Sequence, residues 1–285
     1  MTVTTGPGGS EYCADQVRRF DHDRWLTALF APAPHRPALL ALYAFNIEVA
    51  RTAEQVSEPM LGEIRLQWWR ESLEGIAAGS PREHPVVAAL AAAIGEHRLD
   101  LQLFDQLIDA RTQDLYPAPP ADLAALEHYA AATSGDLTLL ALQCLGIRDA
   151  DSAAAGRHVG IAYALTGLLR AAPYLARRRK VLLPLDLLAE FGCDADTVIE
   201  DRERAKLRRV VARVAGAAAE HLAAARALRR RVAPGALPAL LPGALAELYL
   251  FRLKRAGFDP YDRRLRVSVP RQQLRLLAKA IAHRF

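Results

Sequence analysis

The stretch P-A-L-L-A-L-Y-A-F-N-I-E-V-A-R-T-A-E at residues 37–54, followed after a short break by I-R-L-Q-W-W-R-E at residues 64–71, decides the fold. Apolar side chains recur along the first segment at the three- and four-residue spacing of one wide helical face. This spacing predicts a helix from about His35 to about Ser57. Because the apolar face is wide, we expect this helix to be largely buried.

Three charged residues interrupt the apolar face of this helix. Glu48, Arg51 and Glu54 are three positions apart, so they would stand on neighbouring turns as an acid–base–acid ladder. Two interpretations remain open. The ladder is either an ion network that fills a pocket, or an exposed helix face whose pairs contribute only about 0.2–0.5 kcal/mol each. A buried Arg51 would need both glutamates, because an unpaired buried charge costs several kcal/mol.

The composition favours a helical protein from a reducing compartment. The 285 residues are 52% hydrophobic but only 7% aromatic, and alanine is abundant. Cys13, Cys144 and Cys193 lie far apart, which suggests neither a disulfide framework nor a zinc site. No uninterrupted apolar run reaches the roughly 18 residues that cross a bilayer. We expect a cytoplasmic protein, with peripheral contact at the inner face of the cytoplasmic membrane as an open alternative.

The rest of the chain also has helical spacing. Proline and glycine signals divide it into expected helices at residues 11–28, 61–77, 84–97, 100–115, 122–145, 149–176, 201–232, 234–256 and 270–284. Pro173 should kink or end the last turn of its helix, and residues 177–188 should form a loop leading into a short turn. Only residues 265–269 show a weak strand pattern. The sequence predicts one all-α domain at residues 11–285 after a disordered tail at residues 1–10.

Charge is distributed unevenly along the chain. Residues 1–169 hold 12 basic and 21 acidic residues, a net −9, whereas residues 170–285 hold 25 and 11, a net +14. The second half is therefore a candidate surface for phosphates or an anionic membrane, unless its charges are simply solvated. Nucleic acid is not expected as a partner, because aromatic residues are not interleaved with the arginines.

Several motifs resemble one known family. Residues 43–54, Y-A-F-N-I-E-V-A-R-T-A-E, are similar to the first motif of the squalene/phytoene synthase family, an all-helical branch of the isoprenoid synthases. Residues 68–71, 84–90 and 129–138, together with Asp114, also lie where family members carry similar residues. The resemblance implies a single isoprenoid-synthase-type bundle of roughly ten or more helices around a central cavity.

The same resemblance raises a question about chemistry. Family enzymes join two prenyl diphosphates head to head, and aspartates on two facing helices bind the magnesium ions that hold the diphosphates. The positions of those motifs hold Ala50, Arg51 and Glu54 in the first, and Arg170, Ala171 and Leu175 in the second. Four of the five metal-binding carboxylates would therefore be absent. We expect no metal site and no cofactor, and no confident catalytic residue.

Another part of the resemblance points to a branch without synthase chemistry. Residues 170–174, R-A-A-P-Y, and residues 177–184, R-R-R-K-V-L-L-P, are similar to the phytoene-synthase-like assembly factor of respiratory complex I. This implies a non-catalytic protein whose partners are complex I subunits or a prenyl lipid or diphosphate. The candidate residues of the pocket or anion site are Tyr43, Glu48, Asp114, Arg177, Arg178, Arg179 and Lys180.

An active prenyltransferase is the alternative. In it, Arg51, Arg170 and the basic cluster at residues 177–180 would hold diphosphate in a rearranged site. Only this alternative would call for Mg²⁺ as a cofactor.

Overall fold

The computed structural model describes residues 7–116 and 118–285, and these residues contain helices and no strand. The helices of the first half are α1 (Pro7–Phe20), α2 (His22–Ala28), α3 (Arg36–Ala50), α4 (Thr52–Gln55), α5 (Pro59–Ala77), α6 (Pro85–His97), α7 (Leu101–Thr112), α8 (Leu123–Ala130) and α9 (Asp136–Cys144). Those of the second half are α10 (Ala150–Arg177), α11 (Leu185–Glu190), α12 (Ala195–Ile199), α13 (Arg204–Ala227), α14 (Leu237–Leu240), α15 (Pro242–Arg255) and α16 (Val269–Ile281). Short 3₁₀ turns are η1 (Ala33–His35), η2 (Gln113–Leu115), η4 (Pro234–Ala236) and η5 (Arg263–Leu265), and η3 (Ala131–Gly135) is a π-helical turn. The predicted all-α architecture is confirmed.

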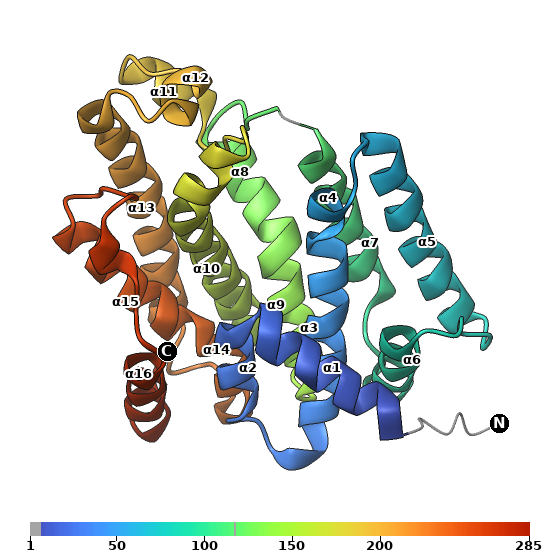
Figure 1. The fold of residues 1–285 in the computed structure, drawn as a ribbon. Coiled ribbons are helices and arrows are strands. Elements are labelled where there is room, and N and C mark those ends of the chain that lie inside the picture. The colour runs from blue at the N-terminus through green and yellow to red at the C-terminus, as the bar shows by residue number, and fades with distance from the viewer. Residues whose placement is uncertain (1–6, 117) are drawn as a thin grey trace.

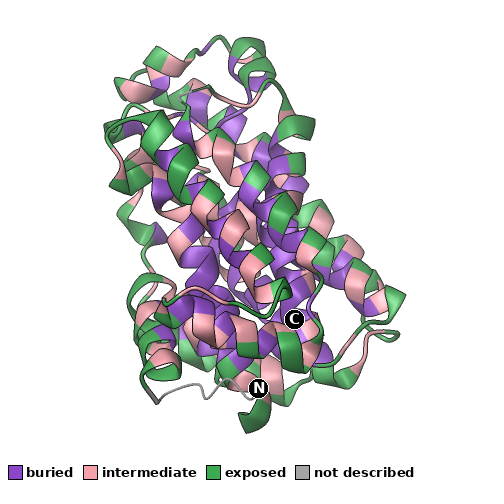
Figure 2. Ribbon diagram, turned by 90° about the vertical axis from the view of Figure 1, so that its right-hand side faces the viewer, coloured by how far each residue is buried: buried purple, intermediate pink, exposed green. Residues whose placement is uncertain are grey.

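Two long helices organise the bundle. α10 packs against α8, α9, α13 and α15, while α3 packs against α1, α6 and α9 (Figure 1). By length and composition α10 would suffice to cross a bilayer, and α14 with α15 would pass as one span bent by 46°. Half of the apolar window of α10 is buried inside the bundle, as in a core helix. Buried residues follow the inner faces of the helices and exposed residues the outer faces (Figure 2).

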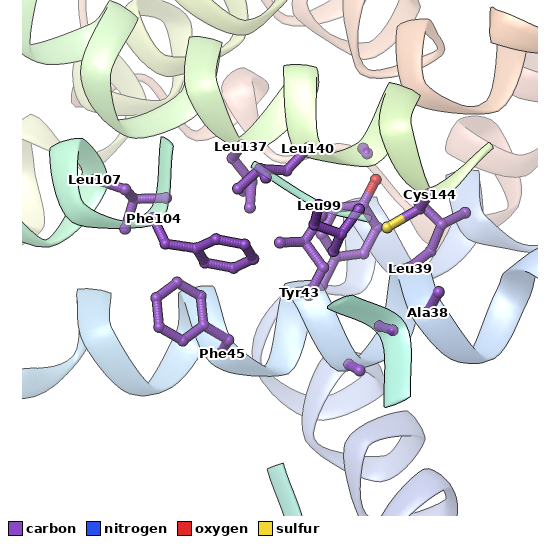
Figure 3. Packing of buried hydrophobic residues seen from close by; sticks show 14 of the residues in the cluster. Ala38, Leu39, Tyr43, Phe45, Leu99, Phe104, Leu107, Leu137, Leu140 and Cys144 are labelled. Carbon is purple, nitrogen blue, oxygen red and sulfur yellow. The ribbon is translucent and has the colours of Figure 1, made fainter. Parts of the chain in front are cut away.

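The core beside α3 is built from aromatic and aliphatic side chains. Phe45 of α3 meets Trp69 of α5 and Phe104 of α7 edge-on, with ring centroids 5.2 and 5.1 Å apart. Edge-to-face pairs of this kind stabilise a core by about 0.5–1.5 kcal/mol beyond the area they bury. Leu137 and Leu140 of α9 close this cluster from the opposite side (Figure 3). The first sequence motif is thus mainly a packing surface.

The N-terminal helices differ from the prediction at their ends. The predicted tail at residues 1–10 falls mostly on residues 1–6, which lie outside the described residues, but α1 already begins at Pro7. Proline suits the first turn of a helix because its missing N–H needs no partner there. The expected helix at residues 11–28 divides at Asp21, whose carboxylate accepts the backbone N–H of Arg24 and so begins α2.

The expected helix from His35 to Ser57 is also divided. α3 ends at Ala50, and Arg51 separates it from the single turn of α4 with φ −89° and ψ −3°. No glycine or proline marks this break in the sequence. The consequence is that Glu54 and Arg51 do not stand on one continuous helical face.

A π-helical turn divides the expected helix at residues 122–145. η3 joins α8 to α9, and α10 crosses it very closely: a Cβ on Gly160 would lie 2.4 Å from the backbone oxygen of Ser134. Only glycine fits at this crossing. Asp136, directly after the turn, is 2% exposed, and its carboxylate lies 3.4 Å from Arg157. Burial raises the pKa of Asp136 to about 6.

The second half contains further corrections. α10 continues through Pro173 to Arg177, so the proline does not end it. The short turn expected after residue 184 is two helices, α11 and α12. Residues 265–269 form no strand, because Leu265 closes the 3₁₀ turn η5 and Val269 begins α16. Pro242 begins α15, so the expected helix at residues 234–256 is three elements.

Candidate functional site

A cavity of about 380 Å³ opens at the end of the bundle where α3, α4, α8 and α10 meet the turn η2. Apolar side chains form part of its wall, and charged ones surround the rest. Of the predicted site residues, the structure brings these to the cavity: Ala50, Glu54, Asp114, Ala171, Leu175, Arg178 and Lys180. The two family motifs therefore face one another across one space, as the resemblance implied.

Three side chains connect the two motifs at the mouth of this cavity. Glu54 of α4 accepts a hydrogen bond from the hydroxyl of Tyr174 at 3.3 Å. The guanidinium of Arg178 lies 3.5 Å from the same carboxylate oxygen and 5.2 Å from the centroid of the Tyr174 ring. Glu54 and Arg178 are partly exposed, so this contact is a solvated ion pair rather than a buried one.

A second network lies deeper in the wall. Arg111 donates to Asp114 at 3.1 Å and to the Tyr129 hydroxyl at 2.6 Å, and that hydroxyl donates to Asp114 at 2.8 Å. Lys180 reaches across from the segment after α10 and donates to the backbone oxygen of Asp114. Burial raises the pKa of Tyr129, so this hydroxyl remains a proton donor at neutral pH. Asp114 is thus held by neighbours on three sides.

Of the two interpretations of the Glu48–Arg51–Glu54 ladder, the ion network does not form among the described residues. Arg51 places its guanidinium 3.9 Å from the centroid of the Phe20 ring of α1. Glu48 lies 4.0 Å from Arg65 of α5, while Glu54 pairs with Arg178. The three side chains thus have different neighbours, and within the described residues no ion pair joins Arg51 to either glutamate. Arg51 remains near solvent and does not need both glutamates.

Arg170 and Tyr43 are also placed away from the cavity. Arg170 stacks on the Tyr249 ring at 3.6 Å and lies 3.8 Å from Asp23 of α2. Asp23 accepts the hydroxyl of Tyr249 at 2.7 Å and the amide of Gln272 at 2.9 Å. This second cluster joins α2, α10, α15 and α16.

Arg177 and Arg179 of the basic segment are exposed and do not line the cavity.

Tyr43 belongs to a buried network around Arg24 in the interior of the bundle. The Arg24 side chain is 11% exposed and donates to Asp21 at 2.7 Å and to Ser134 of η3 at 3.0 Å. The rings of Tyr43 and Tyr163 flank its guanidinium at 5.8 and 4.9 Å. A charged group therefore occupies the space between α3, η3 and α10.

Sequence reasoning missed five residues of these networks: Asp21, Arg24, Arg111, Tyr129 and Tyr174. One signal was present for α2, where D-H-D-R at residues 21–24 places three charges at the start of a short helix that is otherwise apolar. Tyr129 begins the family-like stretch at residues 129–138 and Tyr174 ends the one at residues 170–174, but neither was assigned to the site. The contact of Arg111 with Tyr129 depends on how α7 and α8 pack.

The side chains around the cavity do not suit Mg²⁺, because this ion requires several free oxygen ligands. Its two carboxylates, Glu54 and Asp114, are paired with Arg178 and with Arg111. Within residues 7–116 and 118–285, no group of three or more His, Cys, Asp or Glu side chains is arranged to hold a metal ion. The guanidinium and ammonium groups would repel a cation at this position. The residues that are present suit an anion better than a metal.

Comparisons with known proteins match this chain to synthases and to an assembly factor. Residues 17–273 match the family described as squalene/phytoene synthase. The chain is 34% identical over 253 residues to NADH dehydrogenase (ubiquinone) complex I, assembly factor 6 from Mus musculus, covering 89% of this chain and 76% of the mouse protein. It is 30% identical over 227 residues to phytoene synthase from Arthrospira platensis, covering 73% and 72%. The crystal structure of squalene synthase from Alicyclobacillus acidocaldarius superposes with a TM-score of 0.80 at 22% identity, covering 91% and 99%.

Proposed function

Because this chain belongs to the squalene/phytoene synthase family, we propose that it uses the synthase fold as an assembly factor for respiratory complex I rather than to join prenyl diphosphates. The observation that carries the proposal is the 34% identity to a complex I assembly factor over nine-tenths of the chain. The phytoene synthase match is weaker and covers less of the chain.

The residues around the cavity support this proposal chemically. A prenyl diphosphate ionises only if the negative charge on its leaving group is neutralised, which the synthases achieve with magnesium. Here Ala50, Ala171 and Leu175 supply no ligand, and the acidic side chains are held by arginines. The proposal therefore includes no metal cofactor.

The interior of the bundle supports the same conclusion. A long prenyl chain needs an apolar channel, because it gains binding energy from burial of its methylene groups. The Arg24 guanidinium with its partners Asp21 and Ser134 lies between α3, η3 and α10. An isoprenoid tail in that space would have to displace a paired charge, which costs several kcal/mol. We propose complex I subunits, met in the cytoplasm or at the inner membrane face, as the partners.

The test is deletion of the gene in the source organism, followed by measurement of assembled complex I on native gels and of NADH oxidation by isolated membranes. The expected result is a loss of assembled complex I that the wild-type gene restores. The double substitution Arg178→Ala/Lys180→Ala tests whether the cavity takes part, with Arg229→Ala/Arg230→Ala as a control on an exposed segment far along the chain.

Two results would overturn the proposal. One is normal assembly of complex I in the deletion strain. The other is Mg²⁺-dependent turnover of farnesyl or geranylgeranyl diphosphate by the purified protein, with a rate abolished by Glu54→Ala. The second result would establish the prenyltransferase alternative instead.

A further inference from the structure

The outward face of α16 is apolar and uncovered. Leu274, Leu277 and Ile281 are three and four residues apart, so they share one face of this helix. Their exposed fractions are 67%, 49% and 72%. Three large aliphatic side chains at this exposure on one helix exceed the scattered apolar residues of an ordinary surface.

The opposite face of α16 fixes the helix to the bundle. Gln272 donates to Asp23 and to the Tyr249 hydroxyl at 2.9 and 2.6 Å, Leu276 is fully buried, and Lys279 lies 3.0 Å from Glu247 of α15. The apolar ridge is therefore held outward by a packed and hydrogen-bonded inner face. Its exposure is a feature of the folded protein.

A basic groove of about 230 Å³ adjoins this ridge, between α15, η5 and α16. Its lining is two apolar and four cationic side chains: Leu248, Phe251, Arg252, Arg255, Arg264 and Arg271. Arg271 stands one turn before Leu274 on α16 and so borders both the groove and the ridge. Phe251 is 56% exposed and lies 5.8 Å from the Arg255 guanidinium.

The charge of this region is strongly positive. Residues 248–285 contain ten Lys and Arg residues against two Asp and Glu residues, a net charge of +8. Both acids are already engaged, Asp259 with Arg208 and Asp262 with Arg264. In the part of the chain that the structure describes, Arg255 and Arg271 form no ion pair with a carboxylate. The groove thus holds guanidinium groups that face solvent.

From this combination we infer that the α15–α16 face docks onto an anionic phospholipid surface. The apolar ridge of α16 enters the boundary between headgroups and acyl chains, and the groove receives a lipid phosphate. An amphipathic helix with basic residues beside its apolar face binds membranes in this way, and each basic residue near an anionic surface strengthens binding by about fivefold. The sequence predicted the basic second half, residues 170–285, as a candidate surface for an anionic membrane, and this face lies within it. The basic segment Arg177–Lys180 lies elsewhere, beside the cavity that Arg178 and Lys180 line.

A second copy of the chain fits this face less well. A two-fold contact would place the same patch against itself, and so oppose one +8 region to another. Like charges in such a contact are repulsive. An anionic bilayer satisfies both the apolar ridge and the free guanidinium groups.

The experiment is vesicle flotation of the purified full-length chain with phosphatidylcholine alone and with phosphatidylcholine mixed with phosphatidylglycerol. We expect partition into the mixed vesicles at least about tenfold above that into the neutral ones. Leu274→Gln/Ile281→Gln and Arg255→Gln/Arg271→Gln should each lower that partition by about tenfold or more. Sedimentation without vesicles reports self-association of the same variants.

Matched controls keep the test specific. Met60→Gln/Ile64→Gln removes two apolar side chains of α5 that are 66% and 59% exposed, and Arg229→Gln/Arg230→Gln removes two exposed charges elsewhere. Both should bind as the wild type does, and thermal melts should show that all four variants fold. Three results would overturn the inference. The first is equal partition of the wild type into the two kinds of vesicle, and the second is a loss of partition in the control variants as large as that in the α15–α16 variants. The third is self-association of the protein that only Leu274→Gln/Ile281→Gln abolishes.

Discussion

Arg178 lies 3.5 Å from Glu54, so a guanidinium from the end of α10 occupies the side of Glu54 that faces the cavity. Glu54 belongs to the first family-like motif, whereas Arg178 follows the second motif, three residues after Leu175. The pair joins α4 to the end of α10 by direct contact of opposite charges.

The Glu54–Arg178 contact should contribute little to stability. Both side chains are about two-fifths exposed, and solvated pairs contribute about 0–1 kcal/mol. A double-mutant cycle with Glu54→Ala and Arg178→Ala, measured by urea unfolding, should give a coupling energy below about 1 kcal/mol. A coupling above about 2 kcal/mol would show that the pair is structural and not free to receive a ligand.

The buried pair of Arg24 and Asp21 should contribute much more to stability than the exposed pair does. Arg24→Met leaves Asp21 without its cation in a site where 13% of the Asp21 side chain is exposed. Removal of one partner of a buried pair costs about 3–5 kcal/mol. Urea unfolding of this variant should show that loss, whereas Arg18→Met on the exposed side of α1 should change stability by less than about 0.5 kcal/mol. Equal effects of the two substitutions would contradict the buried network.

Stability should fall as the pH rises through the range where Asp136 titrates, from about 4 to about 6. Burial raises the pKa of Asp136 to about 6 in the folded protein, above 3.8 in an unfolded chain. Between these values the folded state binds more protons than the unfolded state, so stability from this group is present below about pH 4 and is lost as pH rises through about 6. The shift corresponds to roughly 3 kcal/mol.

Asp136→Asn isolates this contribution. The variant should be more stable than the wild type by roughly 3 kcal/mol near neutral pH, and the difference should vanish near pH 4. Urea unfolding at a series of pH values measures it, and subtraction of the two curves cancels the other acidic groups. A difference that grew towards acid would reverse the sign and exclude a buried, protonatable Asp136.

The crossing of α10 over η3 should depend on Gly160. A methyl group there would approach the backbone of Ser134 and Gly135 to 2.4–2.7 Å, so Gly160→Ala should destabilise the protein by about 1–3 kcal/mol or more. Gly167→Ala is the matched control on the same helix, because no atom lies within 4 Å of its Cβ position.

The control substitution Gly167→Ala should stabilise the protein. Alanine favours a helix interior over glycine by about 0.5–1 kcal/mol, so Gly167→Ala should raise the melting temperature while Gly160→Ala lowers it. Two shifts of the same sign would mean that helix propensity, rather than the close crossing, governs both positions.

The sequence predicted most of the fold because helical spacing and proline positions are local signals. The helix at residues 61–77 agrees with α5 within two residues at its start, and the helix at 84–97 agrees with α6 within one. The break at Arg51 was not predicted because no glycine or proline marks it, and the π-helical turn at Ala131–Gly135 was not predicted although it ends at a glycine. Both arise where helices pack against their neighbours, which periodicity alone does not report.

The candidate site was predicted only in part, because packing between segments that are far apart in the sequence decides where some of its residues lie. Of the residues that the motifs and the basic segment predicted for a site, Glu54, Ala171, Leu175, Arg178 and Lys180 line one cavity. Arg51 and Arg170 were predicted with them, but Arg51 lies over the Phe20 ring and Arg170 over the Tyr249 ring of α15. Whether the site residues act in function stays a prediction for the experiments above.

The hydrogen bonds of Asp23 have a consequence for how the polypeptide matures. Its three side-chain hydrogen-bond partners are Tyr163, Tyr249 and Gln272, which are synthesised 140, 226 and 249 residues later. Asp23 must therefore remain hydrated until residue 272 has been synthesised. The native arrangement of α2 can be completed only late in translation, so nascent chains are exposed to holding chaperones and proteases for most of their synthesis.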